Sequence, residues 1–200
     1  MERERRLVLA SQSPRRKELL SLLGYQFEVK VREVDEVFPE SYSPLEGVIH
    51  ISKTKAFAFK DLCEADPNLV ILAADTVVVL GDRVIGKPQI HAEAVSTLTD
   101  LSGQSHQVIT ACSILHDRDQ LTCYHDTTIV KFKALSRAEI DYYIEHYQPF
   151  DKAGAYGIQE WIGLIGIERI QGSYTNVVGL PTEKTFMHLR NIGINIAEKN

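Results

Sequence analysis

The sequence predicts an α/β fold, with a mixed twisted sheet in two lobes around a cleft. Strand-like and helix-like segments alternate along the 200 residues without a linker, a repeat or a low-complexity tract. A tight turn at Gly81-Asp82 joins two strand-like segments into a hairpin, so we expect a mixed sheet and not a purely parallel one. A single domain over residues 1–200 is therefore expected, with two lobes and no linker between them.

The N-terminal half contains apolar runs and helix-start signals that predict six elements. These are strands at residues 7–10, 27–31, 70–80 and 83–85, and helices at 17–23 and about 44–60. Ser13 and Pro14 suit the N-cap and first position of the first helix, and Gly24 lies just past its end. Ser43-Pro44-Leu45-Glu46 is a capping box that opens the second helix. The 70–80 run is rich in β-branched residues, which indicates a strand buried on both faces.

The C-terminal half predicts long strands and three helices. The expected strands lie near residues 106–116, 121–133, 161–170 and 174–179, and the helices at about 92–101, at 136–147 and from 181 onward. Ser136-Arg137-Ala138-Glu139 is a second capping box, which fixes the start of the middle helix. Glycines are concentrated in residues 154–179, which indicates tight turns around the last two strands.

Composition and charge exclude several classes of protein. The 22 Lys and Arg residues against 27 Asp and Glu residues give a net charge of −5, which argues against a nucleic-acid-binding module. The longest apolar run is interrupted by Asp75 and is too short for a membrane span, and the charged N-terminus lacks the apolar core of a signal peptide. The three cysteines show no CxxC spacing, so neither a disulfide framework nor a zinc site is indicated. We expect a cytoplasmic protein.

The segment Ser11–Arg16 has the features of an anion site. A helix N-terminus already carries about half a positive charge, yet three cations follow its first proline: Arg15, Arg16 and Lys17. Exposed backbone N–H groups, hydroxyls and these cations together favour phosphate. On these facts alone, an ordinary helix start with solvated arginines is about equally plausible.

Asp75 is the second strong signal, because it stands in the middle of an apolar strand. An ionised carboxylate is costly in such surroundings unless it is paired, hydrogen-bonded or bound to a metal. The alternative to a functional site is a carboxylate that caps nearby backbone amides. A site is favoured because Ala73 and Ala74 leave room beside Asp75.

Three further residues have a functional and an ordinary interpretation. The segment around Lys87 nearly matches the phosphate-binding G-x4-G-K-[ST] pattern, but Pro88 stands where that loop needs a hydroxyl, so the pattern is rejected. Lys87 could still contact a phosphate from the end of a strand, or it could be an ordinary solvated lysine. Lys55 flanks an apolar helix stripe and Glu36 follows a strand; alone, a snorkelling lysine and a solvated acidic turn explain them. The cations and carboxylates together suit phosphoryl chemistry with Mg²⁺, which prefers oxygen ligands.

Taken together, these segments resemble the Maf family of nucleoside triphosphate pyrophosphatases. No single segment is sufficient, but the ordered set is highly specific and extends over nearly the whole chain. The matching segments are residues 9–20, Ala74–Val78, Gly86-Lys87-Pro88, Leu101–Gly103, Val108–Thr110 and Asp151–Gln159. The resemblance implies a two-lobed fold similar to that of the inosine triphosphatase family, with nucleotide bound in the cleft.

The resemblance also implies a reaction and the residues that carry it. The reaction is hydrolysis of a nucleoside triphosphate to the monophosphate and pyrophosphate, with a divalent metal, Mg²⁺ or Mn²⁺. Asp75 is expected to be the catalytic carboxylate and, with Glu36, to hold the metal. The residues expected to bind the triphosphate are Ser11, Arg15, Arg16, Lys55 and Lys87.

Three positions match the subgroup that acts on dTTP and UTP. They are Arg15, Thr76 and Gln159. The side-chain amide of Gln159 offers an acceptor and a donor, which can pair with N3–H and O4 of uracil or thymine. The sequence departs from the family at Glu160-Trp161, where many members have glycine, so the loop after Gln159 is expected to differ locally.

A rival hypothesis follows from the origin of the family name in inhibition of septum formation. It is a nucleotide-binding regulator of cell division with little turnover. Asp75 beside the cations argues against it, because binding of an anion alone gains nothing from a buried carboxylate. We expect a small nucleotide as the partner, neither nucleic acid nor membrane, and a homodimer as the resemblance implies.

Overall fold

The computed structural model describes residues 5–37 and 39–196 and divides into two compact units. Unit 1 comprises Met1–Asp75, Thr110–Asp126 and Gly179–Asn200, and unit 2 comprises Thr76–Ile109 and Thr127–Val178. The chain therefore passes between the units four times. Three of these passages lie inside β-strands.

Seven strands of the described chain form one mixed sheet, which confirms the expected α/β class. The order is β2-β1-β3-β5-β6-β7, and β4 pairs with β3. β1 (Arg6–Leu9) pairs in parallel with β2 (Phe27–Val29) and with β3 (Leu69–Leu80). β4 (Arg83–Ile85) runs antiparallel to β3, and β7 (Ile167–Gln171) runs antiparallel to β6 (Gln120–Phe132). The remaining strand is β5 (Ser105–His116).

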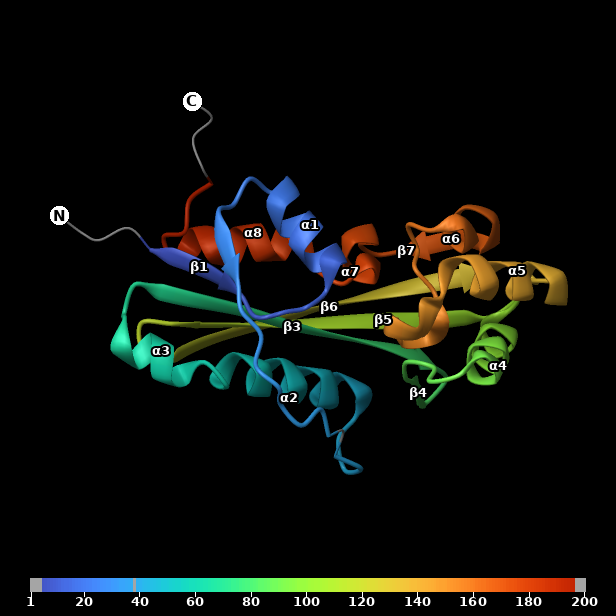
Figure 1. Ribbon diagram of the computed structural model, residues 1–200, viewed down its shortest axis with the longest axis horizontal. Helices are drawn as coiled ribbons and strands as arrows, with labels where there is room; N and C mark the ends of the chain where they lie inside the picture. The colour runs from blue at the N-terminus through green and yellow to red at the C-terminus, as the bar shows by residue number, and fades with distance from the viewer. Residues whose placement is uncertain (1–4, 38, 197–200) are drawn as a thin grey trace. The chain divides into compact units, whose positions relative to one another are not determined.

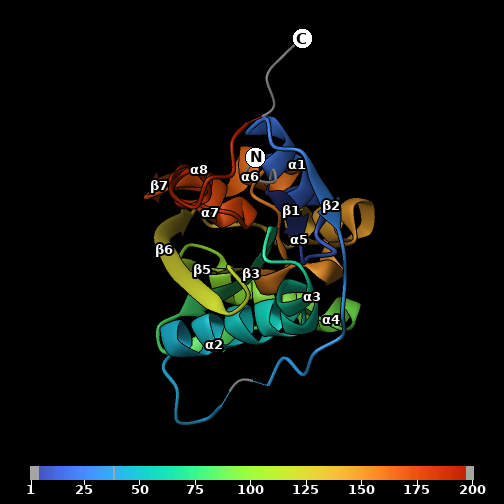
Figure 2. The same ribbon diagram turned by 90° about the vertical axis from the view of Figure 1, so that its left-hand side faces the viewer.

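In unit 1, two helix layers cover the two faces of β1 and β3 (Figures 1 and 2). Helices α2 (Pro44–Phe57) and α3 (Lys60–Ala65) lie on one face; α1 (Pro14–Leu22) and α8 (Thr182–Asn191) lie on the other. Each face has its own buried apolar cluster, one including Ala56 and Cys63, the other Leu20 and Leu189. β3 is therefore buried on both faces, as its β-branched run predicts.

The alternation of side chains along β3 decides which face Asp75 occupies. Leu69, Ile71 and Ala73 belong to the cluster under α2 and α3, whereas Leu72 belongs to the cluster under α1 and α8. Successive strand residues point to opposite faces, so Asp75 continues the first series. The carboxylate thus lies on the α2 face of the sheet.

The starts of three helices match the capping signals in the sequence. The Ser13 hydroxyl accepts a hydrogen bond from the Arg16 N–H, and Pro14 is the first residue of α1. Ser43 and Ser136 both form complete capping boxes, which open α2 and α5 (Arg137–Tyr147). Gly24 has a φ of +85° just past α1, a conformation that favours glycine.

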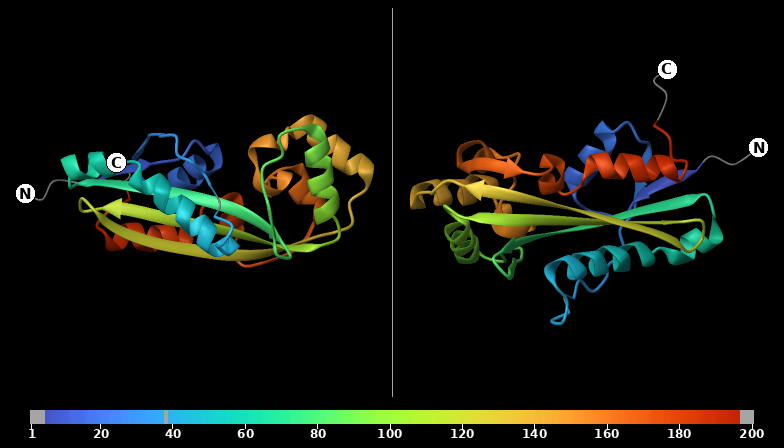
Figure 3. Two further views of the ribbon diagram at one scale, coloured as in Figure 1. Left: turned by 90° about the horizontal axis from the view of Figure 1, so that it is seen from below. Right: turned by 180° about the vertical axis from the view of Figure 1, so that it is seen from behind.

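In unit 2, helices pack around β4 and around the parts of β3, β5 and β6 that belong to this unit. Its elements are α4 (His91–Leu101), α5, the 3₁₀ turns η1 (Pro149–Asp151) and η2 (Ala153–Ala155), α6 (Trp161–Gly166) and α7 (Tyr174–Val178). α4 lies beside α5 and η2 (Figure 3). Val78, Leu98, Phe132 and Tyr143 contribute to a core separate from those of unit 1. The hairpin predicted at Gly81-Asp82 is confirmed, since Leu80 pairs with Arg83 across it.

One expected strand is wrong, a second is right only in its last part, and three short helices are not predicted by the sequence. Residues 161–166 form α6, with only 167–171 as strand, and residues 174–178 form α7. Short apolar runs do not distinguish a buried strand from a single helical turn or two, which explains both errors. The long helix expected over 44–60 ends at Phe57, and α3 follows it.

Within residues 5–37 and 39–196, none of the helices is both long enough and apolar enough to cross a bilayer.

His106 in unit 2 leads to a prediction about acid stability. Its side chain is 2% exposed, its Nε2 is 2.7 Å from the Tyr156 hydroxyl, and its ring stacks on Phe132. Burial lowers the pKa of His106 from 6.5 to about 4, so the unfolded chain binds the proton more tightly. We expect the free energy of unfolding to fall as pH drops from about 6.5 toward 4.

Urea unfolding at pH 7, 5.5 and 4.5 measures this effect. His106→Gln keeps a side chain able to hydrogen-bond Tyr156 but does not titrate, so its stability should depend less on pH across this range. His125→Gln, at an exposed histidine, is the matched control and should follow the unaltered protein. Equal pH dependence in all three proteins would contradict the assignment to His106.

Candidate active site

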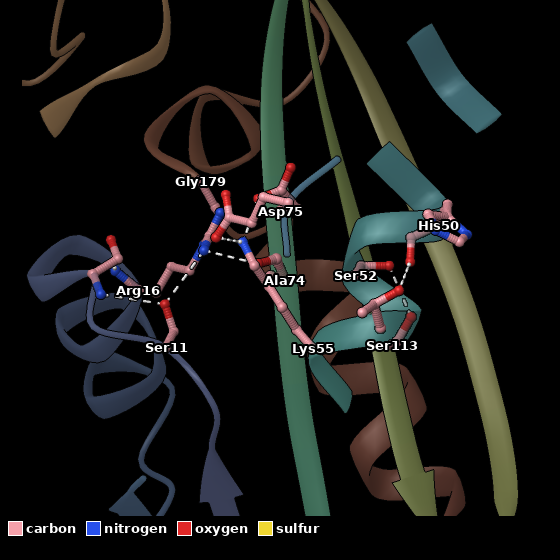
Figure 4. Close-up of polar contacts among 12 residues, drawn as sticks. Ser11, Arg16, His50, Ser52, Lys55, Ala74, Asp75, Ser113 and Gly179 are labelled. Carbon is pink, nitrogen blue, oxygen red and sulfur yellow. Dashed lines mark hydrogen bonds and ion pairs between the residues drawn. The ribbon is translucent and has the colours of Figure 1, made fainter. Parts of the chain in front are cut away.

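Helix α2 brings Lys55 to the carboxylate of Asp75. The Lys55 ammonium lies 2.6 Å from Asp75 Oδ1 (Figure 4). Both side chains are largely buried, with 16% of Lys55 and 13% of Asp75 exposed. The pairing that a buried carboxylate requires is therefore present, and Lys55 is not simply a lysine that extends into solvent.

The same ammonium also binds Glu36. Lys55 Nζ lies 2.8 Å from Glu36 Oε1, and Glu36 is about half exposed, in the irregular chain after β2. Two carboxylates thus meet at one cation. Glu36 and Asp75 are separated by 39 positions in sequence (75 − 36), so no local sequence pattern predicts that both carboxylates contact the same lysine.

Buried hydroxyls beneath Lys55 hold α2 against the sheet. Ser52, one turn before Lys55, shares a 2.8 Å hydrogen bond with Ser113 of β5, and both residues are fully buried (Figure 4). Residues three apart lie on the same helix face, so this contact fixes the side of α2 that carries Lys55. Neither serine can be identified from the sequence, because nothing local distinguishes them from ordinary core hydroxyls.

Arg16 binds three separate parts of unit 1. Its Nε donates to the Gly179 carbonyl at 2.8 Å, and its Nη1 donates to the Ala74 carbonyl at 2.9 Å and to the Ser11 hydroxyl at 3.3 Å (Figure 4). Burial lowers the pKa of Arg16, while the nearby Asp75 carboxylate acts in the opposite direction. The guanidinium stays charged, since arginine side chains are not deprotonated in proteins.

Ser11 and Arg15 complete the N-terminal part of the site. The Ser11 hydroxyl accepts a hydrogen bond from the Ser13 N–H at 3.2 Å, which shapes the turn between β1 and α1. Arg15 lies half-buried in the first turn of α1. Six of the predicted site residues therefore belong to unit 1: Ser11, Arg15, Arg16, Glu36, Lys55 and Asp75.

The three other predicted residues belong to unit 2. Thr76 follows Asp75 in β3, Lys87 is exposed after β4, and Gln159 is exposed just before α6. The Gly154 N–H donates to the Gly86 carbonyl at 3.1 Å, which joins the chain before Gln159 to the chain before Lys87. Their proposed contacts with nucleotide remain predictions.

The carboxylates fit a hard divalent cation in kind. Among residues 5–37 and 39–196, no three His, Cys, Asp or Glu side chains are grouped so as to hold a metal ion. Mg²⁺ keeps several waters and is commonly held by one or two carboxylates together with substrate phosphates. Asp75 and Glu36, joined at one ammonium, supply the two carboxylates of such a set.

Comparisons with known proteins find relatives that match nearly the whole chain. A protein from Flavobacterium psychrophilum named dTTP/UTP pyrophosphatase is 46% identical over 187 residues, covering 93% of this chain and 94% of that protein. Proteins of the same name from Porphyromonas gingivalis and Bacteroides fragilis are 43% and 44% identical, each covering 94% of this chain and at least 94% of their own length.

A solved structure with a similar outline comes from Mycobacterium abscessus. It is described as a nucleoside-triphosphatase / dITP/XTP pyrophosphatase, with 15% identity, a TM-score of 0.41 and coverage of 92% of this chain and 94% of that chain. A likeness this low leaves the expected similarity to the inosine triphosphatase fold as a prediction.

The family itself is settled by sequence. The family model described as Maf-like protein matches residues 6–192, one continuous stretch that includes every predicted site residue. The relatives at 43–46% identity span nearly the full length of both chains. The chain therefore belongs to the Maf family.

Proposed function

We propose that this protein hydrolyses dTTP and UTP to the nucleoside monophosphate and pyrophosphate, with Mg²⁺ or Mn²⁺. The observation that carries the proposal is the Asp75 carboxylate, held inside β3 by Lys55 and next to the carbonyl that binds Arg16. A buried carboxylate beside two cations suits attack on a phosphate better than simple binding of an anion. Relatives at 43–46% identity named dTTP/UTP pyrophosphatase support the same reaction.

The proposed mechanism divides the work among the cations and carboxylates. Ser11, Arg15, Arg16, Lys55 and Lys87 bind the triphosphate and stabilise the charge that develops on the departing pyrophosphate. Asp75 and Glu36 would hold a divalent cation, which would supply further neutralisation of phosphate charge when bound.

Asp75 also has a proposed role toward the attacking water. The water oxygen forms a bond to the α-phosphorus as the bond from that phosphorus to the bridging oxygen breaks, and the water proton passes to the carboxylate. Lys55 orients Asp75 through the 2.6 Å contact to Oδ1. Loss of the carboxylate should therefore affect turnover more than nucleotide binding.

Base selection is proposed to rest on Arg15, Thr76 and Gln159. The exposed Gln159 amide can pair with N3–H and O4 of thymine or uracil, because it carries both an acceptor and a donor. A site built around such hydrogen bonds rejects bases that leave its polar groups unpaired.

Release of pyrophosphate from a panel of nucleoside triphosphates tests the proposal. We expect turnover of dTTP and UTP with Mg²⁺ or Mn²⁺, loss of activity after chelation with EDTA, and much lower kcat/KM with dCTP and purine nucleotides. Turnover of other nucleotides instead would keep the enzyme but remove the role given to Gln159. Tight nucleotide binding without turnover would favour the cell-division regulator.

The setting of the reaction is part of the proposal. We place the protein in the cytoplasm, as a homodimer that acts on free nucleotides and binds neither nucleic acid nor membrane. The net charge of −5 supports a small anionic substrate, because a nucleic-acid surface would be expected to carry the opposite balance.

A further inference from the structure

The turn that presents Gln159 is closed by hydrogen bonds within unit 2. It spans Gly157–Glu160, between η2 and α6, and the Glu160 N–H donates to the Gly157 carbonyl at 3.0 Å. Gln159 is the exposed residue of this turn, whereas Gly157 and Ile158 are buried. The backbone that carries Gln159 is therefore anchored on both sides of it.

The Glu160 side chain links the end of this turn back to its start. The Tyr143 hydroxyl, from α5, donates to Glu160 Oε2 in a short hydrogen bond. The same hydroxyl accepts the Gly157 N–H at 3.0 Å. A continuous path thus runs from the Glu160 carboxylate through the phenol to the backbone amide three residues earlier.

A buried lysine fixes the other oxygen of Glu160. Lys152 Nζ lies 3.2 Å from Glu160 Oε1 and 2.7 Å from Asp151 Oδ1, and its side chain is only 8% exposed. Because Asp151 remains as a partner, loss of the Glu160 charge would not leave Lys152 as an isolated buried cation. The Glu160 carboxylate is therefore replaceable without the largest penalty that a broken buried ion pair brings.

Close packing leaves this turn little room to move. A Cβ on Gly157 would lie 2.7 Å from the Glu160 carboxyl carbon, and a Cβ on Gly163 would lie 1.8 Å from the Ile158 carbonyl oxygen. The second contact is with backbone and leaves no room for a side chain, and the first shows that the Glu160 carboxylate lies directly against the turn backbone. Burial and the Glu160 carboxylate raise the pKa of Tyr143, which keeps its hydroxyl a donor at neutral pH.

Fixed geometry matters here because the chemistry of a glutamine amide does not discriminate by itself. Rotation of the amide by 180° exchanges its donor and its acceptor. The same side chain can therefore pair with thymine or, turned over, with cytosine, whose N3 and N4 groups have the opposite polarity. Preference for one base depends on how the residue is held.

We propose that Glu160 is a positioning residue for base recognition: its carboxylate, held by Lys152 and Tyr143, locks the turn that presents Gln159. This inference rests on the proposed function, in which Gln159 contacts the base. It also gives a physical role to the point where the chain departs from the glycine found in many Maf sequences.

The test is the ratio of kcat/KM for dTTP to that for dCTP in single and double variants. Glu160→Gln keeps the shape of the side chain, but its amide nitrogen must face one of two donors, Lys152 or Tyr143. We expect this ratio to fall about 10-fold or more, because small displacements of a positioning group cost that much, while kcat for dTTP changes less than KM. Tyr143→Phe removes the hydroxyl in the middle of the path and should lower the ratio in the same direction.

The double variant separates positioning from general stabilisation. If Glu160 acts through Gln159, Glu160→Gln should leave the ratio unchanged in the Gln159→Ala background. A similar loss of kcat/KM for both nucleotides, in both backgrounds, would show that Glu160 only stabilises the fold and would overturn the inference. Asp141→Asn, which removes the carboxylate of an exposed ion pair with Arg137 on α5, is the matched control and should keep the ratio of the unaltered protein.

Failure of this inference differs from failure of the proposed function. An unaltered protein that does not prefer dTTP over dCTP would overturn the proposed base selection itself. An unaltered protein that prefers dTTP, together with a Glu160→Gln variant that keeps the full preference, would overturn only the role of Glu160.

Discussion

Replacing Asp75 by asparagine is expected to lower kcat for dTTP hydrolysis by about 10²–10⁴-fold, the range typical for loss of a general base. Asparagine has nearly the same shape but cannot take up the proton of the attacking water. Lys55 keeps its contact with Glu36, so the ammonium is not left without a carboxylate. KM should change far less than kcat, and the midpoint of thermal unfolding should change little.

A matched control comes from a second aspartate of unit 1. Asp126 accepts from Lys184 Nζ at 2.9 Å and is, like Asp75, a partly buried carboxylate paired with a lysine. Asp126→Asn removes a similar charge away from the proposed site and should retain most of the kcat. Near-normal turnover by a folded Asp75→Asn protein would contradict the catalytic role assigned to Asp75.

The two roles open to Asp75 respond differently to metal concentration. If the carboxylate acts mainly as a ligand, Asp75→Asn should regain part of its kcat as Mn²⁺ is raised, since weaker binding is overcome by mass action. If it acts as the base, kcat at saturating Mn²⁺ should stay low. Activity measured over a range of Mn²⁺ concentrations distinguishes the two.

Much of the local structure is foreseeable because its causes are local. Ser43 and Ser136 cap helices through bonds that span three residues, and the Gly81-Asp82 hairpin needs only a two-residue turn. The neighbours of Asp75 in its strand also predict that its carboxylate is buried and needs a partner. They do not predict which residue that partner is, because Lys55 comes from a helix packed against the sheet.

Arg16 shows where local reasoning about the site falls short. Three cations at a helix N-terminus predict that the guanidinium faces an anion. In the structure its Nε donates to the carbonyl of Gly179 and its Nη1 to the carbonyl of Ala74, which are 163 and 58 positions away in sequence. Contacts at that separation leave no periodicity and no motif in the chain, so the charge of Arg16 is evident from the sequence but its part in holding the fold is not.

Arg16→Lys is expected to separate these two contributions. Lysine keeps the positive charge but lacks the planar fork of donors that reaches Ser11, Ala74 and Gly179 together. Leaving a buried carbonyl unsatisfied costs about 1–3 kcal/mol, so loss of these bonds should reduce the free energy of unfolding by at least that much. For a chain of this size, we expect Tm to fall by roughly 2–4 °C for each kcal/mol lost.

Turnover of Arg16→Lys should fall as well as its stability, because the Ala74 carbonyl that Arg16 binds belongs to the residue just before Asp75. Displacing a catalytic group by about 1 Å costs roughly 10²-fold in rate, so kcat of Arg16→Lys should drop about that far even at temperatures where the variant is folded. Calorimetry and pyrophosphate release, measured on the same samples, give both quantities.

Arg15 provides the comparison that decides between charge and geometry. Arg15→Lys alters the preceding cation of the same turn, which takes no part in the three contacts of Arg16, so its Tm should stay close to that of the unaltered protein. If Arg16→Lys retains both Tm and kcat, its charge alone matters and Arg16 is a phosphate ligand of the ordinary kind. If Tm and kcat both fall in Arg16→Lys while Arg15→Lys keeps its Tm, Arg16 acts through the backbone carbonyls that it binds. The shape of the anion site predicted at the start of α1 then depends on Arg16 as much as its charge does.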